Sequence, residues 1–229
     1  MIPDADGTLF RAFTNGWVPW SVLIDPDGKV VFSENEFDEE GFSVAIRQLY
    51  QQPSGEQPAL RRAQSSADCT IVLGGGIGGL VAARELQRRV PAGHRVVLVD
   101  RSAVHTYQPS LLWQMIGERR PEQFRRPLNR LERKGIAFHR AEVEELDLDN
   151  KVVRTTSSDL DYDTLVVSLG AQLAPETVPG FEQMAYNLYT PEGCEQIHDA
   201  LEDFREGTIA VLITAMPFKC RALRSRLPG

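Results

Sequence analysis

The stretch Gly74-Gly75-Gly76-Ile77-Gly78-Gly79 decides the fold class of this chain, because of what stands on either side of it. The apolar run Cys69–Leu73 comes directly before it and has the length and composition of a buried strand. Leu80–Leu86 follows directly and has the composition of a helix. The order strand, glycine turn and helix therefore predicts the start of an α/β unit.

The glycines themselves have the spacing GxGxxG at Gly74, Gly76 and Gly79. In this pattern the first glycine makes a tight turn, the second lets a pyrophosphate approach the backbone, and the third lets the helix pack on the strand. A second apolar run, Arg95–Val99, ends in Asp100, 21 residues after Gly79, where a carboxylate can bind ribose hydroxyls. A flexible glycine loop is the alternative, but strand, helix and acid together favour dinucleotide binding.

Length and composition describe an ordinary globular chain of 229 residues with a net charge of −7. No apolar run is long enough for a transmembrane helix, and Met1–Asp6 lacks the features of a signal peptide, so the cytoplasm is the expected compartment. Three scattered cysteines do not predict a disulfide scaffold or a metal site.

The basic stretch 119–140 carries Phe124, Leu128 and Leu131 at helical spacing. We therefore expect an amphipathic helix whose arginines face water. The stretch has no interleaved aromatic residues for base stacking, and we expect no nucleic-acid partner.

The first 50 residues read as a separate piece, followed by a polar linker at 51–68 that is rich in Pro, Ser and Gln. Trp20–Asp25 and Lys29–Ser33 predict a hairpin, and a helix is expected to end near Tyr50. This piece resembles the second half of thioredoxin-like proteins, with Pro19 at the position of their cis-proline. The CxxC motif of that fold is not present, so the resemblance implies no thiol–disulfide activity.

Beyond Asp100 the pattern continues with alternating elements. We expect a helix, a strand, a β-meander of three short strands, a buried strand that ends in glycine, a second helix and a last apolar strand. In order, these are Pro109–Ile116, Gly135–His139, the meander at about 142–147, 151–155 and 160–162, Thr164–Ala171, Pro191–Arg205 and Thr208–Thr214. The fold class is therefore α/β, with a parallel sheet in three layers and the glycine loop at its carboxyl edge.

Residues 68–220 resemble the N-terminal FAD-binding part of the FAD-dependent pyridine nucleotide–disulfide oxidoreductase superfamily, and within it the sulfide:quinone oxidoreductases. Three local matches carry this resemblance. His105–Pro109 resembles a His-x-aromatic-Gln-Pro segment, Leu165–Ala171 resembles an Ala-Thr-Gly motif with Ser-Leu in place of Ala-Thr, and Met216–Cys220 resembles the cysteine segment of the sulfide-oxidising branch.

The resemblance implies a Rossmann-like FAD/NAD(P)-binding domain over 69–220, an irregular tail at 221–229, and FAD as the cofactor. The cofactor-binding residues that it implies are Gly74, Gly76, Ile77, Gly78, Gly79, Asp100, Arg101, Val143, Leu169 and Gly170. It implies Cys220 as the catalytic thiol, with Lys219 beside it to favour the thiolate. His105 is either a flavin-side contact or a solvent-facing turn residue.

By the same resemblance, sulfide is the electron donor and quinone the acceptor, with peripheral contact to the inner face of a membrane only in a full-length relative. Met216–Cys220 is followed by an arginine-rich tail instead of the family's Pro-led helix, so we expect a truncated and inactive portion. Two alternatives stay open. One is an NADH:quinone reductase, and the other is a non-catalytic nucleotide-binding module.

Overall fold

The computed structural model describes residues 21–34, 39–51 and 68–212. The chain divides into two compact units. The first is Met1–Thr106 with Arg125–Ala171, and the second is Tyr107–Phe124 with Gln172–Gly229. The predicted boundaries at 50, 68 and 220 stay predictions.

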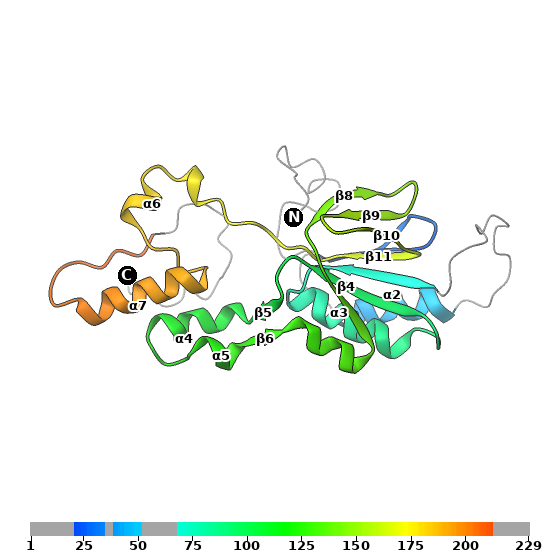
Figure 1. The fold of residues 1–229 in the computed structure, drawn as a ribbon, viewed down its shortest axis with the longest axis horizontal. Coiled ribbons are helices and arrows are strands. Elements are labelled where there is room, and N and C mark those ends of the chain that lie inside the picture. The colour runs from blue at the N-terminus through cyan, green and yellow to red at the C-terminus, as the bar shows by residue number, and fades with distance from the viewer. Residues whose placement is uncertain (1–20, 35–38, 52–67, 213–229) are drawn as a thin grey trace. The chain divides into compact units, whose positions relative to one another are not determined.

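A parallel sheet forms the centre of the first unit (Figure 1). Its four parallel strands lie in the order β11 (Thr164–Val167), β3 (Cys69–Leu73), β4 (Arg95–Asp100) and β7 (Ile136–Arg140). All five residues of β3 are buried, as expected for a strand that is covered on both faces. The predicted α/β fold with a parallel sheet is confirmed.

Two layers cover this sheet, one on each face. Val72 packs on the side of helix α3 (Ile77–Arg89), in a core with Ala82 and Leu86. Ile71 and Leu73 point to the opposite side, because side chains alternate along a strand, and they pack with residues of the meander. The meander consists of β8 (Val143–Asp147), β9 (Val152–Thr155) and β10 (Asp159–Asp161), which pair antiparallel as predicted.

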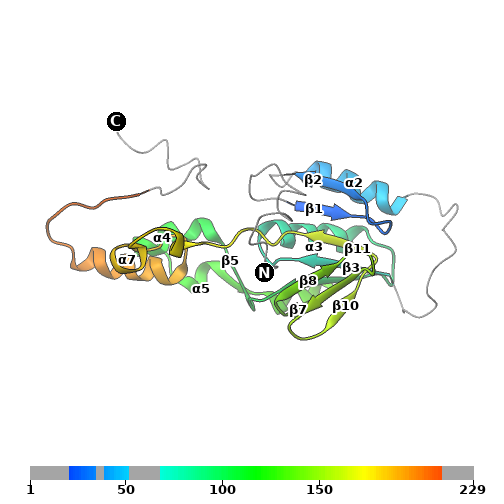
Figure 2. The same ribbon diagram turned by 90° about the horizontal axis from the view of Figure 1, so that it is seen from above.

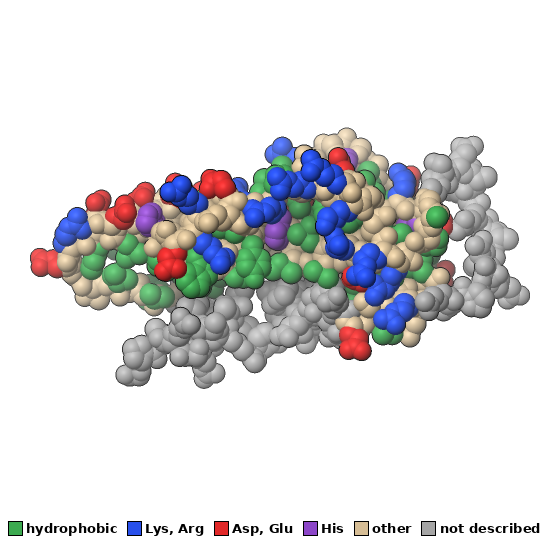
Figure 3. All heavy atoms as spheres, turned by 90° about the horizontal axis from the view of Figure 1, so that it is seen from below, with side chains coloured by type: hydrophobic (Ala, Val, Ile, Leu, Met, Phe, Trp, Pro, Cys, Tyr) green, Lys and Arg blue, Asp and Glu red, His purple; other side chains and the backbone are tan. Residues whose placement is uncertain are grey.

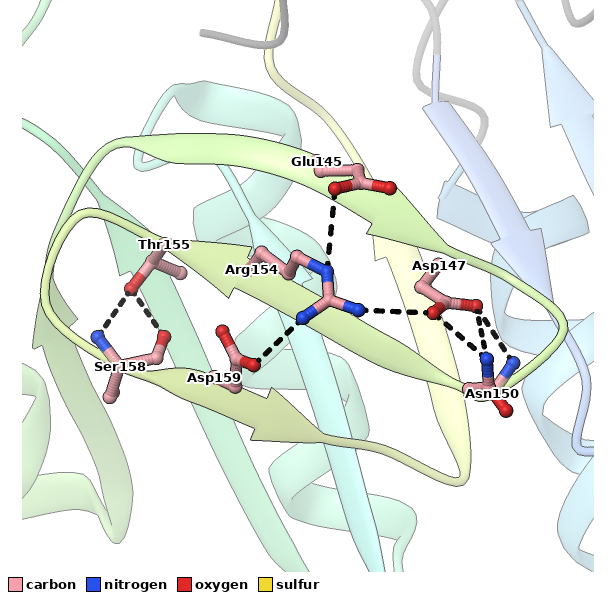
Figure 4. A network of polar contacts seen from close by, with 7 residues as sticks. All are labelled: Glu145, Asp147, Asn150, Arg154, Thr155, Ser158 and Asp159. Atoms are coloured by element: carbon pink, nitrogen blue, oxygen red, sulfur yellow. Dashed lines mark hydrogen bonds and ion pairs between the residues drawn. The ribbon is translucent and has the colours of Figure 1, made fainter.

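A network of charges holds the outer face of the meander together (Figure 4). Arg154, on the middle strand, forms ion pairs with Glu145, Asp147 and Asp159 of the two flanking strands at 3.1–3.4 Å. Asn150 caps the turn by donating from its backbone and its side chain to Asp147. These bonds from Asn150, with Arg154 nearby, lower the pKa of Asp147. Cross-strand charge pairs of this kind favour the three-strand register.

The predicted N-terminal hairpin and helix form, and the hairpin joins the central sheet. Strands β1 (Ser21–Ile24) and β2 (Val30–Glu34) are followed by helix α2 (Glu39–Gln51). β1 pairs antiparallel with β11, so that the full order is β2-β1-β11-β3-β4-β7. Figure 2 shows β1, β2 and α2 together at this end of the sheet. Pro19 and most of the predicted linker lie outside the described residues, and the thioredoxin-like resemblance stays a prediction.

The predicted single helix in the basic stretch is wrong. Instead the chain forms a short helix α5 (Pro121–Phe124), a strand β6 (Arg125–Pro127) that pairs with β5 (Val104–Thr106), and a 3₁₀ helix η2 (Leu128–Lys134). Pro127 interrupts the helical pattern, because proline in a helix interior removes a hydrogen bond and clashes with the preceding turn. Most arginines of the basic stretch 119–140 are exposed. Figure 3 shows one face of the molecule with Lys and Arg side chains at the surface.

The second unit is built from short helices around a small core. They are η1 (Gln108–Ser110), α4 (Leu111–Met115), α5, η3 (Pro175–Thr177), α6 (Phe181–Met184) and α7 (Pro191–Asp203). Leu111, Phe124 and Cys194 form the buried core of this unit. Thr190 caps α7 by accepting a hydrogen bond from the Gly193 N–H at 3.0 Å.

The predicted strand at Thr208–Thr214 is not found in its described part, residues 208–212. Ile209 and Val211 are each 59% exposed. The segment pairs with no strand in the portion of the chain that the structure covers, and an apolar run without a pairing partner cannot form a sheet. Within that same portion, none of the helices has the length and apolar character needed to cross a bilayer.

Candidate functional site

The glycine loop connects β3 to α3 at the carboxyl edge of the parallel sheet, where ligands bind in open α/β folds. Gly74 has φ of +103°, and its N–H donates to the Val99 carbonyl at 2.8 Å. A Cβ at Gly74 would lie 2.2 Å from the carbonyl oxygen of Ser168, which follows β11. A Cβ at Gly79 would lie 1.8 Å from the Gly74 carbonyl oxygen. The fold of the protein itself therefore requires glycine at both positions.

Gly76 is different, because no described atom lies within 4 Å of the position that its Cβ would take. Its φ of −72° and ψ of −177° are open to any residue. The residue stands at the N-cap of α3, where neither a capping side chain nor an acidic residue of the first turn is found among the described residues. The first turn therefore leaves backbone N–H groups for an anion. Ile77 is exposed and Gly78 half-buried in this turn.

Asp100 is tied to the loop by its side chain. One carboxylate oxygen accepts the Gly75 N–H at 2.5 Å, and the other accepts the Ser102 N–H at 2.6 Å. His105 Nδ1 lies 2.8 Å from the Gly75 carbonyl oxygen, so His105 donates to the carbonyl of the same residue. Sequence reasoning did not single out Gly75, because its role depends on contacts across the fold. Through Gly75, Asp100 holds the loop to the end of β4 and His105 holds it to β5.

A cavity of about 190 Å³ opens beside Asp100. It brings together four of the predicted cofactor residues, Asp100, Arg101, Val143 and Leu169. The remaining lining residues are Val99, Ala141, Glu142 and Ala171. Ala141, Glu142 and Ala171 follow the ends of β7 and β11 in sequence, and this position after a parallel strand is the signal that would have identified them.

The predicted residue Gly170 stands between two residues of the cavity wall and has φ of +70°. Arg101 forms an ion pair with Glu142 at 3.5 Å across the cavity rim, with both side chains about half exposed. Val143 is buried and Leu169 is half-buried in the same hydrophobic cluster. The cavity thus combines a carboxylate, a cation and an apolar wall.

This geometry fits the adenosine half of a dinucleotide. The open N-terminus of α3 suits a pyrophosphate, the Asp100 carboxylate suits ribose hydroxyls, and Val143 and Leu169 offer an apolar surface to a flat base. No described residue explains why position 76 is glycine, whereas an approaching phosphate does.

The cysteines divide into two groups. Cys69 and Cys194 are buried, and burial raises the pKa of both thiols. Cys194 also donates its Sγ–H to the Leu188 carbonyl at 3.3 Å. Both residues therefore act in packing. Cys220, the predicted catalytic thiol, lies beyond the residues that the structure describes, as do Met216 and Lys219.

Comparison with known proteins agrees with the geometry. Residues 69–212 match the family model described as pyridine nucleotide-disulphide oxidoreductase. The chain is 33% identical over 159 residues to the mitochondrial sulfide:quinone oxidoreductase of Mus musculus, covering 66% of this chain and 34% of that protein. It is 32% identical over 139 residues to the type II NADH:quinone oxidoreductase NdhA of Mycobacterium tuberculosis, and this match covers 58% of this chain and 27% of that protein.

Among solved structures, the sulfide:quinone oxidoreductase from Aquifex aeolicus superposes with a TM-score of 0.54 at 26% identity, over 59% of this chain and 32% of that one. The chain therefore spans about a third of the length of the relatives that it matches. FAD is the cofactor of the matched family. The glycine loop, the parallel sheet and the match over residues 69–212 together show that this chain belongs to the pyridine nucleotide–disulphide oxidoreductase family.

Proposed function

We propose that the first unit binds the adenosine diphosphate half of FAD, as part of an FAD-dependent quinone oxidoreductase of the sulfide:quinone oxidoreductase kind. The observation that carries this proposal is the open space at Gly76, at the N-cap of α3 in the loop that Asp100 holds through Gly75. Asp100 also lines the cavity together with Val143.

In this site each residue has a separate task. The N–H groups at the start of α3 bind the pyrophosphate, and Gly76 leaves room for its approach. Asp100 accepts hydrogen bonds from ribose hydroxyls while its bond from the Gly75 N–H holds it in place. Bound FAD supplies two-electron transfer from a donor to a quinone, and the protein supplies position and electrostatics.

We propose sulfide as the donor, since the relatives include sulfide:quinone oxidoreductases and the sequence places Lys219 next to Cys220. NADH is the second candidate, since type II NADH:quinone oxidoreductases also match the chain. Anaerobic addition of each donor to an FAD-loaded longer form distinguishes them by loss of flavin absorbance. Nucleotide binding with reduction by neither donor would select the non-catalytic alternative.

The test of the binding proposal is Gly76→Val. A valine side chain would stand where the pyrophosphate approaches, so we expect FAD affinity to fall at least about a hundredfold while stability stays close to that of the wild type. Fluorescence titration of FAD and urea unfolding measure the two quantities. Ala92→Val adds a similar side chain at an exposed turn and serves as the control. Equal affinity of the wild type and Gly76→Val would refute the proposed site.

A further inference from the structure

The N-terminal strand β1 is buried on both of its faces. Leu23 points into the core on the helix side, where it packs with Phe42 and Ile46 of α2. Val22 and Ile24 point into the core on the meander side. An isolated hairpin is marginally stable and exposes one face to water, whereas β1 has the burial of an interior strand. Residues 21–34 and 39–51 are therefore built into the first unit.

The core on the meander side contains residues of β1 and residues that line the proposed cofactor cavity. Val22 pairs in register with Val167 of β11, three residues before Gly170. Val22 and Ile24 share one hydrophobic cluster with Val143 and Leu169, which line the cavity. β1 therefore belongs to the same hydrophobic cluster as two residues of the cavity wall.

β11 also sets the position of the glycine loop. Its continuation, Ser168, donates its N–H to the Leu73 carbonyl at 2.8 Å. The Ser168 carbonyl oxygen lies 2.2 Å from the position that a Cβ of Gly74 would take, so the two backbones are in close contact. A shift of β11 would move this contact as well as the cavity wall.

Two further contacts attach residues 21–51 at separate places. Tyr50 of α2 lies 2.9 Å, between hydroxyl oxygens, from Thr70 of β3. At the hairpin turn, the Pro26 carbonyl accepts a hydrogen bond from Lys151 Nζ of the meander. The N-terminal segment is thus held by the strand pairing, by two cores, at the hairpin turn and near the end of α2.

We infer that residues 21–51 are a positioning element of the cofactor site, which holds β11 against the glycine loop and completes the cavity wall at Leu169. They are an additional part of the FAD-binding unit that lies before residue 69, where the family match begins. The expected effect of this segment on FAD affinity rests on the function proposed above. Its expected effect on the position of β11 does not, so the inference and the proposed function can fail separately.

The first test compares buried and exposed valines of the same hairpin in the full chain. Val22→Ala removes packing next to β11, while Val31→Ala changes a side chain that is 41% exposed. We expect Val22→Ala to speed hydrogen exchange of the β11 amides about tenfold and to weaken FAD binding several-fold, at a temperature where circular dichroism shows the chain fully folded. Val31→Ala should leave both quantities near the wild-type values.

Unchanged β11 exchange in Val22→Ala would overturn the inference even if FAD does not bind at all. Unchanged FAD affinity in that variant, with wild-type binding intact, would overturn the positioning role.

The second test uses no core substitution, so its result does not depend on whether Val22→Ala folds. A site-specific protease sequence is inserted between residues 52 and 67, and the full chain is cut after it has folded. We expect the two pieces to stay together in size-exclusion chromatography and to retain FAD binding. Separation of the N-terminal piece with unchanged FAD affinity would show a tethered, independent segment and overturn the inference.

Discussion

At Gly79 a Cβ would lie 1.8 Å from the carbonyl oxygen of Gly74, a distance at which the backbone must shift. We therefore expect Gly79→Ala to lower the free energy of unfolding by about 2 kcal/mol or more, as measured by urea denaturation. Gly76→Ala is the matched control, because its Cβ would meet no described atom, and it should change stability by less than about 0.5 kcal/mol. Equal effects of the two substitutions would contradict this explanation of the glycine spacing.

The two buried cysteines should be unreactive in the native protein. Burial raises the pKa of the Cys69 and Cys194 thiols, and only the thiolate reacts with alkylating agents. Mass spectrometry after brief iodoacetamide treatment should therefore find both residues unmodified until urea is added. Full modification of either residue without denaturant would show that its thiol is accessible to solvent in the folded protein.

Residue by residue, the sequence predicts the parts of the site that depend on local spacing. Gly74, Gly76, Gly79 and Asp100 can be identified because a glycine turn and the acid after the next strand occur at characteristic separations. The partner of the Asp100 carboxylate could not be identified. Its bond to Gly75 spans 25 residues and exists only once β3 and β4 are paired.

At the scale of elements, a polar contact joins α2, β3 and the turn before β4. His94 Nε2 lies 2.8 Å from the Thr70 hydroxyl, and its ring stacks edge-to-face against Tyr50. Burial is the main cause that lowers the pKa of His94 below its ordinary value of 6.5. The nearby Asp68 and Asp163 oppose this shift, and Arg95 adds to it.

The lowered pKa of His94 predicts a loss of stability in mild acid. Above pH 6.5 the imidazole is neutral in both the folded and the unfolded chain, so it adds no pH dependence. As the pH falls below 6.5, the unfolded chain binds the proton more readily, and stability decreases until the folded-state pKa is passed. The melting temperature should therefore fall between pH 7 and pH 5.5, and less so in His94→Gln. The same fall in His94→Gln would assign the effect to other groups.

Elements with a clear local pattern are predicted well, and the errors have local causes too. The meander and the hairpin follow from short alternating runs that are separated by turn residues. The helix expected through Phe124 and Leu128 was wrong because these two residues belong to different cores and Pro127 separates them. Helical spacing of apolar residues does not show that they face one common core.

For the whole molecule, the largest feature that could not be predicted is the place of the hairpin. β1 pairs with β11, whose residues are more than 130 positions later in the chain, and no local signal encodes that pairing. A hairpin needs a partner surface, and the sequence does not say which one. The central parallel strands were easier to predict. Each is a run of mostly apolar residues that follows a helix or loop of ordinary length.

The last prediction concerns turnover by the whole 229-residue chain. A thiol cycle that oxidises sulfide needs two sulfurs within reach of each other, with Cα atoms about 4.4–6.8 Å apart. The chain has three cysteines, and two of them are buried, Cys69 at the start of β3 and Cys194 in the core of the second unit. Burial of both thiols opposes their use as the partner of Cys220. We therefore expect no sulfide-dependent loss of flavin absorbance when the FAD-loaded chain is mixed with sulfide under anaerobic conditions.

The control for this experiment is dithionite, which should bleach the same sample and so show that the bound flavin can be reduced. A longer form that supplies a second accessible cysteine should be bleached by sulfide as well. Bleaching of the 229-residue chain by sulfide, lost in Cys220→Ala, would show instead that one cysteine is enough. In that case an external thiol or a second sulfide would have to act as the second sulfur, because the disulfide step still needs two.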